Sequence, residues 1–446
     1  MAAPLTLPQQ IRNRDRERLR RYARNLAFYR GKQWPRNDSR SRRLILNYTR
    51  NIITKTTGYL LTGRSNTVTP DDPTDAARAR ADEAQLALEQ LHDQNALSLL
   101  DHSTELDCAV LGDAAYKVIW DPTDTRVRVS APDPSGIFAW HWPDDPSRIW
   151  RIANRFRLDA DSVRATLPDI AAPLQPHTWI TEAWTIATVE TFLGDALISS
   201  QPNPYGFIPF IIINNVLEPG ELWGTSDIDF FREAQEELNR EATQISQVLE
   251  LSGNPIAVLE NVTDTEAIAV RPGALWELPA DAKAYLLDLL RGGGVKLHTD
   301  WYDTVQRALN DLSHTPRAAF GDTRRDLSGV ALELELDPII KHIERKRLSR
   351  TPAYRARNEM MLAILDQFTD TALRAANHSI SWGSVLPIDR DRDIRNEVSL
   401  TAAGIHSRTT AIQEIGGIDD PEAEFTRALD EAAQLAAASA NTNPTP

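Results

Sequence analysis

Residues 226–251 constrain the fold of this chain more than any other segment. Their apolar residues recur at steps of three or four and so form one stripe on a helix: Phe231, Ala234, Leu238, Ala242, Ile245 and Leu249. Ser226 is a typical N-cap, with Asp229 at the third helical position as in a capping box. Gly253 and Pro255 end the helix. Such a helix is about 39 Å long, and its narrow stripe favours side-by-side packing over burial in a core.

A second helix is predicted over residues 296–312, where apolar residues repeat at the same steps. Between the two helices lie four short apolar pieces, residues 255–260, 267–270, 275–278 and 285–290, separated by polar and Pro/Gly turns. We expect them to form a small β-containing unit, and we interpret the glycines at 292–294 as a hinge. The pattern indicates an antiparallel helical pair that carries a compact module.

After this pair, residues 315–326 have the composition of a loop, with Pro316, Gly321 and three arginines. Helical periodicity resumes over residues 327–349 and continues through 352–368, with Pro338 inside the first part. An internal proline removes one backbone hydrogen bond and clashes with the preceding turn. We therefore expect a kinked helix, bent near residues 334–337.

The first half of the chain is predicted to join helices to a mostly antiparallel β module. Helices are expected over residues 8–30, 48–61 and 75–95, followed by a fourth up to about residue 111. Strands are expected over residues 114–120, 126–130, 137–142, 149–158, 179–189 (or on to 192) and 207–213.

The end of the chain is predicted to be helical over residues 407–415 and 421–437, followed by a disordered tail over 438–446. The expected fold class is α+β. No run of 18 apolar residues occurs, so no segment is expected to span a membrane.

The charge of the chain is unevenly distributed around a net value of −14. Residues 11–50 hold thirteen arginines and one lysine against three acidic residues, so the rest of the chain is strongly acidic. We expect the arginines of the first helix to pair with acidic groups of another helix or subunit, with direct nucleic-acid contact as the alternative. An acidic surface binds phosphates poorly, so such a chain is a poor static binder of DNA. It could still form a channel through which a duplex slides.

No catalytic or cofactor motif is present, and we expect no enzyme activity, no cofactor and no metal. The chain has no P-loop, no G-x-G-x-x-G, no H-E-x-x-H and no G-x-S-x-G. Cys108 is the only cysteine and lies in an apolar helical pattern, so we interpret it as a buried small residue.

Histidines and acidic clusters also have plain interpretations. His298, His314 and His342 are isolated and are expected to be surface or packing residues. The aspartates at 227 and 229, at 389, 391 and 393, and at 419 and 420 fit a helix start, a solvated loop and a helix cap. A two-metal nuclease built from such carboxylates remains as an alternative.

Five segments resemble the portal proteins of tailed bacteriophages in their residues and in their order along the chain. They are residues 28–31 (FYRG) with 47–48 (NY) and the helix that ends at Gly63; 109–115 (AVLGDAA); 224–226 (GTS) with Gln235 and Asn239; 327–332 (LSGVAL); and 407–422 (SRTTAIQEIGGIDDPE). The resemblance covers nearly the whole chain.

This resemblance implies a portal-type subunit. Residues 1–225 would form a wing, 226–252 a first stem helix, 253–295 a clip, and 296–314 a second stem helix. Residues 315–326 would form a tunnel loop, 327–399 the kinked tunnel helix and the remaining wing, and 400–437 a crown.

The resemblance also implies a passive role for named residues. The stem residues that would line an electronegative channel are Glu233, Glu236, Glu237, Arg240 and Glu241. The loop residues that would narrow the channel are Arg317, Ala318, Ala319, Phe320, Arg324 and Arg325. Pro338 would let the tunnel helix bend. Arg324 and Arg325 either brush DNA phosphates or pair with Asp322 and Asp326.

The implied assembly is a homo-oligomeric ring, usually a dodecamer, at one capsid vertex of the virion, formed in the host cytoplasm. Its implied partners are double-stranded DNA in the channel, the terminase motor, the major capsid and scaffold proteins, and head-completion or adaptor proteins. No membrane partner is expected. Another head protein without a DNA channel remains as an alternative.

Overall fold

The computed structural model describes residues 5–34, 43–166, 175–253, 257–261, 281–286, 294–322, 329–369, 371–375, 377–385, 390–416 and 421–441. The chain divides into two compact units, Met1–Trp382 and Gly383–Pro446, which are described separately. Helices and antiparallel strands both contribute, so the predicted α+β class is confirmed. Among the described residues, no helix is both long and apolar enough to cross a membrane.

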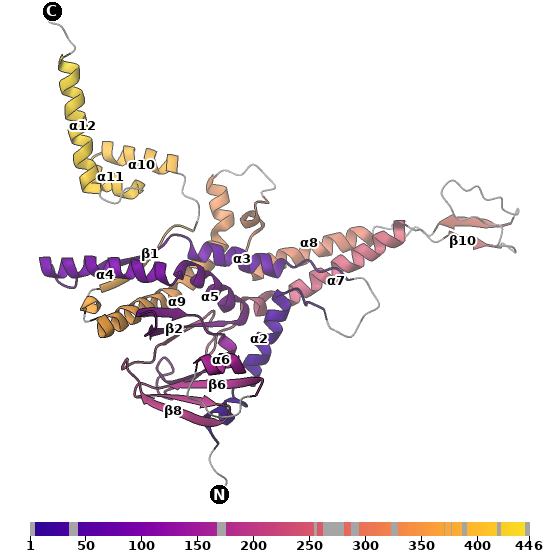
Figure 1. Ribbon diagram of the computed structural model, residues 1–446. Helices are drawn as coiled ribbons and strands as arrows, with labels where there is room; N and C mark the ends of the chain where they lie inside the picture. The colour runs from indigo at the N-terminus through magenta and orange to yellow at the C-terminus, as the bar shows by residue number, and fades with distance from the viewer. Residues whose placement is uncertain are drawn as a thin grey trace, which may run out of the picture. The chain divides into compact units, whose positions relative to one another are not determined.

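The large unit contains helices that frame its sheets (Figure 1). They are α1 (Leu7–Ile11), α2 (Arg16–Tyr29), α3 (Tyr48–Leu61), α4 (Asp75–Gln94), α5 (Leu97–Leu111), α6 (Ala160–Thr166), α7 (Asp227–Gly253), α8 (Gly294–Leu312) and α9 (Gly329–Thr369). The helices predicted over residues 48–61, 75–95, 226–251 and 296–312 are confirmed to within about two residues, the usual uncertainty of helix ends.

The prediction of one helix over residues 8–30 is wrong, because the chain breaks between α1 and α2. Asp15 adopts a left-handed conformation with φ of 54°. Contacts elsewhere hold this turn: Arg12 forms an ion pair of 2.6 Å with Asp195, and Arg14 donates to the Ala139 carbonyl at 3.0 Å. Tertiary pairing therefore overrides the helical periodicity here.

A three-stranded antiparallel sheet lies at the centre of the large unit. Its order is β3 (Arg126–Ser130), β2 (Asp113–Asp121) and β9 (Phe210–Asn214). The hairpin predicted from residues 114–130 is confirmed by the pairing of β2 with β3. The strand predicted from residue 207 begins only at Phe210.

A five-stranded antiparallel meander follows, with β4 (Ile137–His141), β5 (Ile149–Asp159), β6 (His177–Trp184), β7 (Thr188–Leu193) and β8 (Ala196–Pro202) in that order. The single strand predicted over residues 179–189 is wrong. The chain turns between β6 and β7, where the Thr188 amide donates to the Thr185 hydroxyl at 2.9 Å and the Thr185 amide donates to the Thr188 carbonyl at 2.9 Å. This turn has neither glycine nor proline.

Two shorter pairs complete the described strands. β1 (Arg64–Thr69) pairs antiparallel with β12 (Asn377–Trp382), more than 300 residues later in the chain. β10 (Ala257–Glu260) pairs antiparallel with β11 (Lys283–Leu286) between α7 and α8. This agrees with the expected β-containing module, although the predicted pieces at 267–270 and 275–278 lie outside the described residues.

Several apolar clusters of described residues hold the large unit together, and three of them bear on the site. The largest packs α4, α5 and α9 on the three-stranded sheet, with Tyr116 and Tyr354 fully buried. A second joins α2, α3, α5, α7 and α8. A third lies between the two sheets, where Ala115 and Phe210 meet Ile152 and Trp184.

The small unit is helical, with α10 (Arg390–Ala402), α11 (Arg408–Ile415) and α12 (Pro421–Asn441). Ser407 caps α11 by accepting from the Thr410 amide at 3.1 Å, which confirms the predicted helix. α12 continues to Asn441, so residues 438–441 are helical and not part of the expected disordered tail. Residues 442–446 lie outside the described residues.

Candidate functional site

Two glycines bring the start of α7 against the end of α5. Gly112 has φ of +110°, and a Cβ placed on it would lie 2.5 Å from the Gly224 carbonyl oxygen. A Cβ on Gly224 would lie 2.1 Å from the Gly112 carbonyl oxygen. Only glycine fits at such a close backbone approach. The segments 109–115 and 224–226, more than 100 residues apart, therefore meet at one point.

Ser226 caps α7 from inside this junction. Its hydroxyl accepts from the Ile228 amide at 3.1 Å and contacts the Ala109 and Val110 carbonyls. The predicted capping box is not formed as expected, because the Asp229 carboxylate accepts instead from Asn25 at 3.1 Å. The cap residue itself is confirmed.

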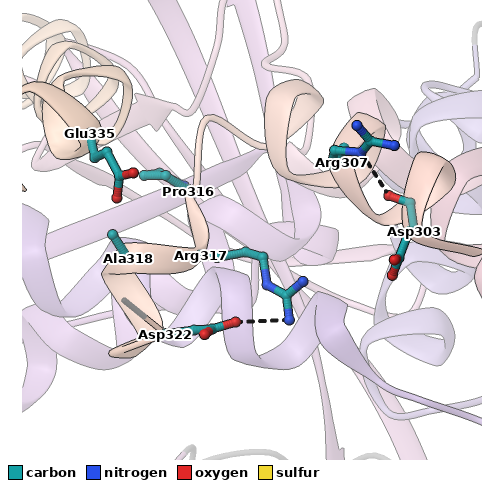
Figure 2. A pocket seen from close by; sticks show the side chains of 7 residues that line it. All are labelled: Asp303, Arg307, Pro316, Arg317, Ala318, Asp322 and Glu335. Carbon is teal, nitrogen blue, oxygen red and sulfur yellow. Dashed lines mark hydrogen bonds and ion pairs between the residues drawn. The ribbon is translucent and has the colours of Figure 1, made fainter. Parts of the chain in front are cut away.

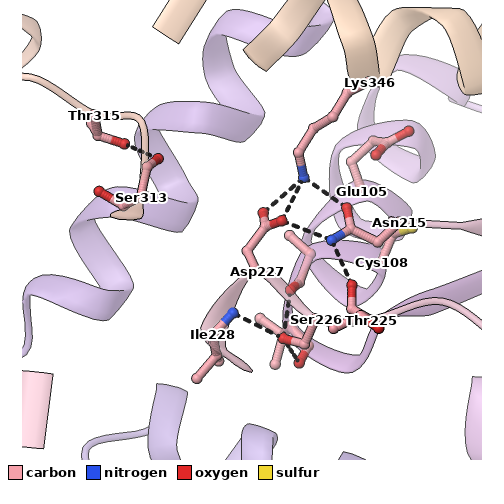
Figure 3. Close-up of polar contacts among 12 residues, drawn as sticks. Glu105, Cys108, Asn215, Thr225, Ser226, Asp227, Ile228, Ser313, Thr315 and Lys346 are labelled. Carbon is pink, nitrogen blue, oxygen red and sulfur yellow. Dashed lines mark hydrogen bonds and ion pairs between the residues drawn. The ribbon is translucent and has the colours of Figure 1, made fainter. Parts of the chain in front are cut away.

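A buried ion pair anchors α7 to α9. The Lys346 ammonium lies 2.7 Å from the Asp227 carboxylate and donates to the Asn215 side-chain oxygen at 2.7 Å (Figure 3). Burial alone would raise the pKa of Asp227, but the nearby charges of Lys346 and His342, together with hydrogen bonds from Lys346 and Asn215, outweigh it and hold the pKa below its usual value. Both charged side chains are largely removed from water, so each depends on the other.

A second buried cation lies one helical turn later in α9. Arg350 is fully buried and donates to the Glu105 carboxylate at 3.1 and 3.2 Å and to the Asn214 carbonyl at 2.7 Å. It also contacts the Cys108 sulfur at 3.1 Å. Burial raises the pKa of the Cys108 thiol well above its usual range, which supports a packing role for this cysteine.

A third buried cation, Arg357, pairs with Asp101 on α5. Lys346, Arg350 and Arg357 follow at helical spacing on α9, and Asp101 and Glu105 are spaced four apart on α5. These five residues were not identified from the sequence as important. The spacing of basic residues on α9 and of acidic residues on α5 is the signal that could have found them.

α7 and α8 run side by side in opposite directions (Figure 1). Val305 and Leu309 of α8 share an apolar cluster with Phe231 and Leu238 of α7. Among the described side chains, two polar contacts cross the pair: His298 bonds to Glu241, and the Trp301 indole donates to Glu237 at 3.0 Å. Because the residue number falls on α7 as it rises on α8, the pair is antiparallel, as predicted.

The acidic stem residues differ in exposure. Glu233 and Glu236 are exposed, and neither forms an ion pair with a described residue. Glu237 is half-buried and pairs with the exposed Arg240, whose hydrogen bond lowers the pKa of Glu237. Glu241 is only 2% exposed, because it is enclosed against His298, which corrects the expectation that it faces a solvent-filled channel.

The end of α8 forms a tight turn into the loop segment. The His314 amide donates to the Asp311 carbonyl and the Thr315 amide to the Asn310 carbonyl, with His314 at φ of 52°. This pattern is a Schellman motif with histidine in the position usually held by glycine. The His314 ring also stacks on His342 of α9, with the ring centroids 5.0 Å apart.

The predicted loop contains a short 3₁₀ helix, η2 (Arg317–Phe320). Figure 2 shows Arg317 pointing to Asp322, with an ion pair of 2.8 Å. Ala319 is buried and Phe320 is 43% exposed, so the loop presents an aromatic ring to solvent. Ala318 is half-buried, and Arg324 and Arg325 lie outside the described residues.

α9 remains helical through Pro338 and Pro352 over its 41 residues. Pro338 lies on an exposed side of the helix, between the buried Leu336 and Ile339. The expected kink at this proline stays a prediction.

The arginines of α2 have partners inside the same chain. Arg18 is buried, stacks on Trp223 at 3.7 Å and donates to the Ile137 carbonyl at 2.7 Å. Arg24 pairs with Asp229 at 3.3 Å, and Arg21 donates to the Gly224 carbonyl at 3.2 Å. Arg24 therefore pairs with an acidic group of another helix, as expected, whereas Arg18 and Arg21 bond mainly to backbone carbonyls outside helices.

Among the described residues, no group of three or more His, Cys, Asp or Glu side chains is arranged so that it could bind a metal ion. The aspartates at 227 and 229 are engaged by Lys346 and by Arg24 and Asn25. The aspartates at 389, 419 and 420 lie outside the described residues.

A known protein family matches almost the whole chain. A family model described as "Phage portal protein, SPP1 Gp6-like" matches residues 9–438. A search of curated proteins gave no match. The family match covers both compact units and nearly every residue of the chain. The chain therefore belongs to the SPP1 Gp6-like family of phage portal proteins.

Proposed function

We propose that this chain is one subunit of a ring at one vertex of a tailed-phage capsid, through which double-stranded DNA enters and leaves. Family membership supports a phage portal role and a structural, non-enzymatic protein. The observation that carries the proposal is the antiparallel α7–α8 pair, which is anchored at its base by buried ion pairs and carries exposed carboxylates along one side.

The exposed side of α7 is proposed to line the channel. Glu233 and Glu236 are the exposed carboxylates, and Glu237 is partly neutralised by Arg240. Fixed negative charges repel phosphates. They form none of the cation–phosphate contacts that release counterions and hold DNA in place, so the duplex slides instead of binding. Glu241 is left out of this lining because it is buried.

The loop at residues 315–326 is proposed to narrow the channel. Arg317 is held by Asp322, and its side chain remains 38% exposed. We propose that Arg324 and Arg325 contact the DNA backbone and that α9 bends at Pro338 as the loop moves. A proline inside a helix lowers the cost of such a bend, because one backbone hydrogen bond is already missing.

The remaining parts are assigned by the same proposal. Residues 1–225 with part of 327–399 form the wing, 253–295 the clip and 400–437 the crown. The ring, proposed as a dodecamer, forms in the host cytoplasm and becomes part of the virion. It docks the terminase motor, the major capsid and scaffold proteins, and later the head-completion or adaptor proteins.

An in vitro packaging assay tests the loop. Replacing Arg317, Arg324 and Arg325 with alanine removes three cations from the segment proposed to touch DNA. We expect rings of normal appearance and a several-fold change in DNA uptake. A matched control replaces three exposed, ion-paired arginines elsewhere, Arg78, Arg164 and Arg427. Equal uptake by the loop variant and this control would contradict the proposed role of the loop.

A further inference from the structure

α8 carries more apolar surface than α7 covers. Val305 and Leu309 pack against α7, but four other apolar residues of α8 remain exposed: Leu297, Trp301, Ala308 and Leu312. Leu297 is 72% exposed, Trp301 47% and Leu312 49%. At 3.6 residues per turn the four lie within an arc of about 60°, so they form one continuous stripe along the helix. We call this stripe the α8 outer face.

Such a stripe on α8 indicates that another protein surface covers it in the assembled state. Single exposed apolar residues are ordinary, but a row of them at helical spacing along a charged helix marks an interaction surface. The two sides of this face differ in character, because Asp300 and Asp311 border the stripe on the side away from α7. Neither aspartate forms an ion pair with a described residue, so the border is negatively charged.

A groove on α3 has the opposite charge. It encloses a volume of about 630 Å³ and is lined by Arg50, Lys55, Tyr59 and Phe320 among others. Arg50 and Lys55 lie over the rings of Tyr29 and Tyr59 and form no ion pair with a described acidic residue. The groove therefore combines cations with exposed aromatic carbon, which fits an apolar stripe bordered by aspartates.

Within one subunit, α3 meets α8 well away from the centre of the α8 outer face. Tyr48 at the start of α3 contacts the Tyr302 hydroxyl at 3.4 Å, and Tyr302 lies about 110° around α8 from the centre of the stripe. A closed ring needs two different complementary surfaces on each subunit, because each contact is heterologous. One subunit of this chain offers such a pair of surfaces.

We propose that the α8 outer face of one copy packs against the α3 groove of the next copy and forms the seam of the ring. This inference rests on the proposed function, which supplies the ring, and adds the surfaces that close it. The apolar stripe supplies the buried area, and the pairing of Asp300 and Asp311 with Arg50 and Lys55 selects the register.

Two kinds of variant test the seam, with ring assembly of the full-length protein measured by mass photometry. Ala308→Glu places a charge in the middle of the stripe at a residue outside the described apolar clusters of the chain. We expect the fraction of protein in rings to fall at least tenfold at a concentration where the unmodified chain is half assembled. Leu86→Glu on α4, at a residue 56% exposed, is the matched control and should leave assembly unchanged.

Charge reversal gives the more specific result. The Asp300→Lys/Asp311→Lys variant and the Arg50→Glu/Lys55→Glu variant should each assemble poorly, while the variant that carries all four changes should recover ring formation. Normal rings from Ala308→Glu, or no recovery in the fourfold variant, would overturn the seam. Failure of the unmodified chain to form rings would instead count against the proposed function itself.

If Ala308→Glu forms normal rings but loses terminase or adaptor binding, the α8 outer face docks that other protein and the seam is wrong. Circular dichroism spectra and thermal unfolding of each variant, compared with those of Leu86→Glu, separate loss of assembly from loss of folding.

Discussion

Lys346 joins α9 to the first turn of α7, and its contribution to stability is that of one half of a buried ion pair. In Lys346→Met the side chain keeps its length and loses its charge, so Asp227 remains buried without a cation. We expect a loss of about 3–5 kcal/mol in the free energy of unfolding, measured from urea denaturation of the full chain.

The double variant Lys346→Met/Asp227→Asn is the control for this interpretation. It removes the stranded charge while leaving an amide that can still bond to Asn215. The double variant should recover at least about 1 kcal/mol over Lys346→Met, because an unpaired buried charge costs more than an unpaired amide. If the double variant is no more stable, the loss comes from packing and not from charge.

His342 gives the fold a dependence on pH. Burial, followed by the nearby Lys346, lowers the pKa of His342 from 6.5 to about 4. Between pH 6.5 and 4, the unfolded chain therefore binds a proton at His342 that the folded chain does not bind. The contribution of neutral His342 to the free energy of unfolding is complete above pH 6.5 and is lost as the pH falls towards 4. Between pH 7.5 and 5, we expect the free energy of unfolding of His342→Gln to fall by about 2 kcal/mol less than that of the parent protein.

Equilibrium unfolding of the two proteins at several pH values measures this difference. Other groups also respond, since the pKa of His92 is lowered to about 4 and that of Asp107 is raised to about 6. These contributions are common to both proteins and cancel in the comparison. Parallel stability curves for the parent and His342→Gln would contradict the account of His342.

At the scale of elements, the contact between Gly112 and Gly224 fixes where α7 leaves the sheets of the large unit. Gly224→Ala places a Cβ 2.1 Å from the Gly112 carbonyl oxygen and 2.8 Å from the Asn215 amide nitrogen, so the backbone has to move. We expect a loss of more than about 3 kcal/mol or failure to accumulate folded protein, measured by thermal unfolding.

Gly58→Ala is the matched control for this substitution. Gly58 lies inside α3, and a Cβ there meets nothing within 4 Å. Alanine should stabilise the helix by up to about 1 kcal/mol, because glycine has the poorer helix propensity. Similar effects of both changes would show that the close approach at Gly224 is not important.

Elements whose signal is local were predictable from the sequence. The helix α3 is bounded as predicted, since Asn47 caps it and its apolar residues follow one period. α7 and α8 were predictable for the same reason, because their apolar stripes and the glycines near their ends are features of the local sequence. The turn between β6 and β7 was missed because Thr185 closes it with its hydroxyl, a signal far weaker than glycine or proline.

Features that depend on distant residues were not predictable. The pairing of β1 with β12 joins polar segments more than 300 residues apart, and neither has a strong strand pattern. The buried pairs of α9 were missed because lysine and arginine are usually exposed, and only the matching spacing of acidic residues on α5 indicates their burial. Among the predicted stem residues, the burial of Glu241 depends on His298, which is 57 residues away.

At the scale of the molecule, three parts of the large unit fit the proposed portal ring. Buried ion pairs anchor the α7–α8 pair at its base, the segment after α8 forms a compact turn, and the α8 outer face offers an apolar stripe. Each part is explained by contacts within one subunit or by the need for a neighbour.

The central claim is that copies of this chain close into a ring around an axial channel. Negative-stain electron microscopy of the purified full-length protein tests it most directly. We expect ring-shaped particles with a central hole in end views. Monomers only, or compact particles without a hole at every concentration tested, would contradict it.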